Sequence, residues 1–167
     1  MGESPDVFRL LFVCSGNTCR SPLAEALARR ELATRKLSDR IEVGSAGMGA
    51  VQGAPASEGS AAAGAAAGLD LSGHISRVVT PDLVVESDLI LTMGIGHLAG
   101  VLELGGEGKS ALLSGFAEGR EDGLGWAVPD PFGGGLQIYL ETLRALEELV
   151  HHSIARLEQT LTDASDA

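Results

Sequence analysis

Short apolar runs alternate along this chain with longer amphipathic segments. The first apolar run, at 7–14, has the length and composition of a buried parallel strand. Three further strands are expected at 41–46, 88–93 and 110–114. Helices are expected at 22–36, 55–68, from 80 onward, at 94–104 and at 136–161. This alternation predicts a three-layer α/β/α fold with a central four-stranded parallel sheet.

Local signals set some of these boundaries. Ser21-Pro22 and Thr80-Pro81 each place a capping residue before a proline, which predicts a helix start. The alanine-rich segment 55–68, capped near Ala54 or Ser57, is broken by glycines and also fits a flexible linker. We favour a helix there, because parallel strands need a crossover connection. The glycine-rich stretch 115–135 is expected to be a loop, and its length suggests a functional role.

Composition narrows the class of protein. The 167 residues fit one domain, 1–167, with a core of its own. A net charge of -11 argues against broad nucleic-acid binding, which needs clustered basic residues. We find no targeting signal and no apolar run of membrane length, so we expect a soluble, cytoplasmic protein without a membrane partner. Two cysteines are too few for a disulfide scaffold.

The segment 14–21, CSGNTCRS, carries the strongest chemical signal. It lies between the first strand and the first helix, where open α/β sheets bind their ligands. A short loop of this kind turns backbone N–H groups inward, and the helix start adds the positive end of its dipole. Arg20 supplies a planar fork that grips two phosphoryl oxygens. The segment therefore predicts a phosphate site. Its residues are Ser15, Gly16, Asn17, Thr18, Cys19, Arg20 and Ser21.

Cys14 is the candidate nucleophile of this site. The helix start and Arg20 favour its thiolate, which can attack phosphorus and form a phosphocysteine. Ser21 can donate a hydrogen bond to that sulfur and help it leave. Taken alone, Cys14 would more readily be interpreted as a buried residue at the end of a strand. The spacing of Cys, five residues, Arg and Ser between strand and helix favours the nucleophile.

The sequence resembles the low-molecular-weight protein phosphatases. The resemblance rests on LFVCSGNTCRSPLAEAL at the front, GSAG at 44–47, GHISRVVTPDL at 73–83, DLILTM, and PDPFGG at 129–134. It implies that Asp130 is the general acid and that Ser45 and His74 support Asn17. It also implies a phosphorylated protein as substrate and partner, with no cofactor and no metal. We expect a monomer.

Several of these residues have a plainer interpretation. Asp130 makes chemical sense as the proton donor to a poor leaving group, yet an aspartate before proline is also a common turn residue. His74 alone would be an ordinary satisfied loop residue. Cys19 resembles the family's second loop cysteine, which can pair with Cys14 on oxidation, or it is a small buried residue. Trp126 is expected to anchor the loop that carries Asp130.

Two positions bear on the substrate. Thr18 stands where tyrosine-directed members usually carry a bulkier aliphatic residue, and Phe132-Gly133 stands where they usually carry tyrosine. Both resemble the branch that removes phosphate from protein phosphoarginine, with Phe132 walling the slot. Phosphotyrosine is the alternative. An arsenate reductase or a non-catalytic oxyanion-binding module is less favoured, because resolving thiols are lacking and Cys14 and Asp130 are both present.

Overall fold

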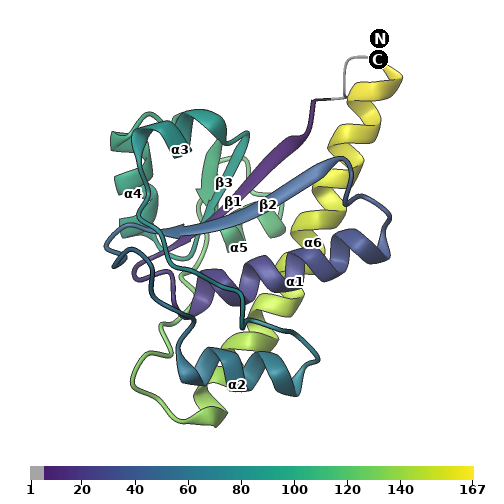
Figure 1. The fold of residues 1–167 in the computed structure, drawn as a ribbon. Coiled ribbons are helices and arrows are strands. Elements are labelled where there is room, and N and C mark those ends of the chain that lie inside the picture. Colours follow the sequence, from purple (N-terminus) through teal and green to yellow (C-terminus); the bar gives the residue numbers. More distant parts are fainter. Residues whose placement is uncertain (1–5) are drawn as a thin grey trace.

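The computed structural model describes residues 6–167. Four strands form one parallel sheet in the order β2-β1-β3-β4 (Figure 1). They are β1 (Phe8–Cys14), β2 (Ile41–Gly47), β3 (Leu89–Thr92) and β4 (Ser110–Leu112). The predicted parallel α/β architecture is confirmed.

Helices cover both faces of this sheet (Figure 1). Those on one face are α1 (Arg20–Thr34), α2 (Glu58–Ala66), α5 (Leu113–Ala117) and α6 (Leu136–Asp166). Those on the other are α3 (Pro81–Glu86) and α4 (Ile95–Glu103). Within residues 6–167 no helix combines the length and the apolarity that crossing a bilayer requires.

The central strand β1 contributes side chains to both layers of the core. Leu10 and Phe12 belong to the cluster beneath α1 and α6, whereas Leu11 and Val13 belong to the cluster beneath α3 and α4. This division follows from the two-residue period of a strand. Cys14 continues the first set, so its side chain points to the α1 face, where the next helix begins.

The cap predictions have mixed outcomes. Ser57 caps α2 by accepting from the N–H of Ser60 at 3.2 Å, and Thr80 caps α3 in the same way. The cap predicted at Ser21 is wrong: α1 begins at Arg20, two residues earlier than predicted, and Cys19 occupies the cap position without a side-chain hydrogen bond. Ser21 lies inside the helix because tertiary contacts engage its hydroxyl, as described below.

The predicted strand at 110–114 is also partly wrong. The strand ends at Leu112, and residues 113–117, expected to be strand and loop, form helix α5. Helix α5 packs with Leu113, Ser114 and Gly115 buried. A side chain at Gly115 would meet the backbone of Gly123 at 2.8 Å. Packing against the following chain, rather than local helix propensity, therefore sustains this short helix.

Candidate active site

The Cys14 loop, residues 14–20, joins β1 to α1 and rests on the end of β2. The N–H of Gly49 donates to the carbonyl of Ser15 at 2.9 Å. A Cβ atom at Gly47 would lie 2.5 Å from that carbonyl oxygen and 2.8 Å from the amide nitrogen of Asn17. Glycine at position 47 therefore lets the loop approach the strand.

Asn17 holds the loop together from its centre. It is buried and has a left-handed backbone with φ 55°. Its side-chain Nδ2 donates to Ser21 Oγ at 2.8 Å and to Ser45 Oγ at 2.9 Å. Its Oδ1 accepts from the N–H of Arg77 at 2.9 Å, and its carbonyl oxygen lies 2.7 Å from His74 Nε2. The structure thus brings the predicted supports, Ser45 and His74, into direct contact with Asn17.

The thiol of Cys14 is buried inside this loop. Its Sγ lies 2.9 Å from Ser21 Oγ and accepts from the N–H of Asn17 at 3.3 Å. Because the Asn17 amide already donates to Ser21 Oγ, the hydroxyl hydrogen of Ser21 is free to point at the sulfur. Two donors therefore converge on Cys14 Sγ, an arrangement that stabilises negative charge there.

Arg20 projects from the start of α1 into the same site. Its Nη1 donates to the carbonyl of Val128 at 2.9 Å, while the N–H of Val128 donates to the carbonyl of Met93 at 2.8 Å. Its Nη2 lies 3.6 Å from Asp130 Oδ2. Its Nε is buried and has no hydrogen-bond partner among residues 6–167. The buried guanidinium therefore keeps a donor available for an anion while facing the Asp130 carboxylate.

Comparison with known proteins shows the family of this chain. The family model for low molecular weight phosphotyrosine protein phosphatases matches residues 9–163. The chain belongs to this family. Among curated family members, the Wzb tyrosine phosphatase of Salmonella typhimurium is 36% identical over 74% of this chain and 76% of its own. A protein-arginine-phosphatase of Geobacillus stearothermophilus is 32% identical over 90% of this chain and 97% of its own.

Solved structures of the low molecular weight phosphatase family share the fold. The YwlE arginine phosphatase from Geobacillus stearothermophilus superimposes with a TM-score of 0.83 at 30% identity, over 93% of this chain and 96% of its own. A YwlE arginine phosphatase mutant with a phosphorylated active-site serine also has a TM-score of 0.83, at 32% identity over 90% of this chain and 96% of that one.

Of the two predicted specificity residues, one lies in the Cys14 loop and the other lies beside Asp130. Thr18 is half-buried in the loop itself. Phe132 donates its backbone N–H to Asp130 Oδ1 at 3.1 Å, and 76% of the residue is exposed. Its ring is therefore available to contact a substrate next to the candidate acid.

Cys19 is buried with a free thiol. The thiol donates to Ser57 Oγ at 3.3 Å and lies 3.6 Å from the hydroxyl of Tyr139. Cys14 is also free and contacts different partners. A disulfide between Cys14 and Cys19 under oxidation stays a prediction.

His97 is a residue of this site that the sequence interpretation missed. It lies in the first turn of α4, and its Nε2 is 2.8 Å from Ser15 Oγ. Burial, and secondarily the charge of Arg20, lower the pKa of His97, while Asp130 acts in the opposite direction. The sequence did offer a way to find it. His97 follows shortly after β3, and open parallel sheets bind their ligands at the carboxyl ends of the strands.

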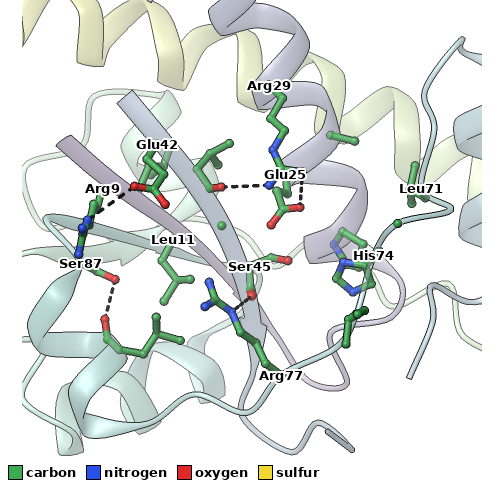
Figure 2. Close-up of a pocket in the computed structure, with 18 of the residues that line it drawn as sticks. Arg9, Leu11, Glu25, Arg29, Glu42, Ser45, Leu71, His74, Arg77 and Ser87 are labelled. Atoms are coloured by element: carbon green, nitrogen blue, oxygen red, sulfur yellow. Dashed lines mark hydrogen bonds and ion pairs between the residues drawn. The ribbon is translucent and has the colours of Figure 1, made fainter. Parts of the chain in front are cut away.

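The protein also has a cavity of about 680 Å³. Figure 2 shows residues that line it. Ser45, His74 and Arg77, three residues that contact Asn17, line it together with parts of β1, β2, α1 and α3. Cys14 and Arg20 are not part of its lining. We therefore place the candidate active site at the Cys14 loop and not in this cavity.

Proposed function

We propose that this chain is a cysteine-dependent protein phosphatase acting in two steps. Cys14 Sγ attacks phosphorus, so an S–P bond forms as the P–O or P–N bond to the substrate breaks, and Asp130 gives its proton to the leaving group. The Asp130 carboxylate then takes a proton from water, which attacks the phosphocysteine. Inorganic phosphate leaves, and Ser21 stabilises the released thiolate.

One arrangement carries this proposal. Ser21 Oγ, in the first turn of α1, lies 2.9 Å from Cys14 Sγ, and the neighbouring Arg20 faces Asp130 at 3.6 Å. The proposed nucleophile, the donor that stabilises its sulfur, the anion-binding arginine and the acid are thus brought together by the Cys14 loop, the start of α1 and the segment that carries Asp130. The unpartnered Nε of Arg20 supports an anionic substrate, because a buried donor of this kind costs free energy until it is paired.

We propose protein phosphoarginine as the substrate. Thr18 is small and leaves room at the rim of the Cys14 loop. The exposed ring of Phe132 can pack against the aliphatic part of a phosphoarginine side chain. The half-exposed carboxylate of Asp130 can pair with its guanidinium group. The arginine phosphatase relative aligns over 90% of this chain and the tyrosine phosphatase relative over 74%. Phosphotyrosine is the second candidate, because the tyrosine phosphatase has the higher identity, 36% against 32%.

The test compares kcat/KM for a phosphoarginine protein with that for a matched phosphotyrosine peptide. Wild type, Thr18→Ile and Cys14→Ser are measured in parallel. We expect a phosphoarginine preference that Thr18→Ile reduces, because the larger side chain narrows the rim. A phosphotyrosine preference in the wild type would rule out the arginine assignment and leave the cysteine mechanism intact.

The Cys14→Ser variant tests the mechanism itself. Because one solved relative carries a phosphorylated active-site serine, we expect Ser at position 14 to gain one phosphoryl group and then stop. Intact-mass spectrometry after incubation with substrate detects this adduct. Turnover that survives in Cys14→Ser would overturn the mechanism. Wild-type protein that binds phosphoprotein and never releases phosphate would indicate a binding module instead.

A further inference from the structure

We propose that His97 is a positioning residue that fixes the hydroxyl of Ser15 as an additional donor to the phosphoryl group. This inference rests on the proposed phosphatase function. It adds a side-chain donor to the backbone N–H groups of the Cys14 loop, and it assigns a task to a histidine from a distant part of the chain.

Two side chains from different helices reach the same oxygen, Ser15 Oγ. His97 Nε2 lies 2.8 Å from Ser15 Oγ, and Arg20 Nη2 donates to that oxygen at 3.4 Å. His97 arrives there because β3 pairs with β1, with Thr92 beside Val13. The contact therefore joins the carboxyl ends of two adjacent strands, at the edge of the sheet that carries the candidate active site.

The surroundings favour the neutral imidazole. Burial and the charge of Arg20 both lower the pKa of His97, and Asp130 opposes them only in part. The position of His97 in the first turn of α4 acts in the same direction, since the positive end of a helix dipole disfavours a cation. A neutral ring carries one proton, on either Nδ1 or Nε2.

The other ring nitrogen decides between these two tautomers. His97 Nδ1 is buried and has no hydrogen-bond partner among residues 6–167. A proton there would leave a buried N–H donor without an acceptor, which proteins rarely tolerate. A proton on Nε2 leaves only a lone pair unpaired at Nδ1. The Nε2–H tautomer therefore donates to Ser15 Oγ.

The two donors determine where the hydroxyl hydrogen of Ser15 can point. A serine oxygen has two acceptor lone pairs and one donor hydrogen. With His97 and Arg20 both donating to Ser15 Oγ, the hydroxyl hydrogen is left to point elsewhere. Ser15 is exposed at the surface of the Cys14 loop, so a phosphoryl oxygen held by that loop is its natural acceptor.

A double-mutant cycle tests this assignment. We measure kcat/KM for para-nitrophenyl phosphate, together with inhibition by vanadate, in Ser15→Ala, His97→Leu and the double variant. A hydrogen bond to a charged group predicts a loss of roughly tenfold to a hundredfold for Ser15→Ala. Because His97 acts through Ser15, we expect the double variant to lose no more than Ser15→Ala alone.

Further variants separate positioning from folding. His97→Gln keeps an N–H donor and should recover most of the activity, whereas His97→Asn, too short to reach Ser15, should behave like His97→Leu. His152→Leu, at an exposed position of α6, is the matched control and should keep wild-type activity. Thermal unfolding of each variant confirms that it is folded at the assay temperature.

Two results would overturn the inference: losses that add up in the double variant, or full activity in folded His97→Leu and His97→Asn. Both are distinct from failure of the proposed function. If Cys14→Ser kept turning over, the phosphocysteine mechanism would fail whatever the cycle showed. If Cys14→Ser is inactive and the cycle is additive, only the role of His97 fails.

Discussion

The guanidinium of Arg20 faces the carboxylate of Asp130 at 3.6 Å, and solvent reaches the two side chains very unequally. The Arg20 side chain is 7% exposed, whereas that of Asp130 is 50% exposed. The cation is thus fixed in the protein, while the carboxylate borders the open side of the site. This placement is the one that the proposed acid requires, because the leaving group of a protein substrate lies on the solvent side of the site.

Replacing the candidate acid should slow catalysis and spare binding. For Asp130→Asn we expect kcat to fall by about 10²–10⁴-fold with little change in KM, because the amide keeps the shape but cannot supply the proton. The loss in kcat/KM, which reports the first step, should shrink for aryl phosphates with acidic leaving groups, because these need no protonation. Steady-state kinetics over a series of such substrates measures both effects.

The matched control for this change is Asp122→Asn. Asp122 is an exposed aspartate in the segment that leads to Asp130, and its carboxylate accepts from the N–H of Leu124 at 2.9 Å. We expect wild-type kinetics from it. An equal loss in both variants, or no dependence of the Asp130→Asn loss on the leaving group, would contradict the assignment of Asp130 as the acid.

Two residues with left-handed backbones should respond in opposite ways to glycine. Asn17 has φ 55° and Lys36 has φ 58°. Lys36→Gly should raise the free energy of unfolding by about 0.5–1 kcal/mol, because glycine adopts this conformation without strain just beyond the end of a helix. Asn17→Gly should lower it by about 2–4 kcal/mol, since three side-chain hydrogen bonds are lost, two of them buried.

Urea unfolding of both variants provides the measurement. Both changes relieve a left-handed backbone, so Lys36→Gly is the reference against which the loss of the Asn17 side chain is compared. We also expect Asn17→Gly to lose phosphatase activity, because the loop is no longer tied to Ser21 and Ser45. A stability gain in Asn17→Gly would show that the loop holds its shape without this side chain.

Two helical glycines provide a second matched pair. A Cβ at Gly59 in α2 would overlap the buried ring of Tyr139, whereas a Cβ at Gly96 in α4 would meet nothing within 4 Å. Gly96→Ala should therefore stabilise the protein by about 0.5–1 kcal/mol, as alanine favours a helix. Gly59→Ala should destabilise it by about 1–3 kcal/mol through overpacking, as measured by urea unfolding. Equal effects would mean that α2 shifts away from α6 without cost.

The lowered pKa of His97 predicts a loss of stability in acid. The unfolded chain takes up the proton first, near the ordinary value of 6.5, so protonation favours unfolding. Stability should fall as the pH drops below about 6.5 and level off, for this group, once the folded protein is also protonated. Burial is the main cause of the lowered pKa of His97; of the charged groups nearby, Arg20 lowers it further and Asp130 raises it.

Urea unfolding at about pH 7.5 and about pH 5.5 checks this expectation. His97→Gln removes the titrating group, so the free energy of unfolding should fall less between the two pH values. His152→Gln, at an exposed position, should leave it as in the wild type. A fall that is unchanged in His97→Gln would show that His97 does not contribute to the acid sensitivity.

Much of the architecture was decided by local pattern. The strand at 8–14 and the long helix from 136 follow from apolar runs and from helical periodicity, and the caps at Ser57 and Thr80 follow from residue type. The loop from Cys14 to Arg20 was also predictable, because its chemistry is concentrated in consecutive residues. These patterns predict the structure correctly because they depend only on residues that are close along the chain.

Tertiary structure alone decided the contacts between distant segments. Ser21 has the sequence of a helix cap, yet its hydroxyl lies between Cys14 and Asn17 because the loop folds back over it. His97 reaches Ser15 only through the pairing of β3 with β1. Sequence pattern specifies which residues form a strand or helix; which side chains then meet depends on strand order and register, and these are set by packing of the whole core.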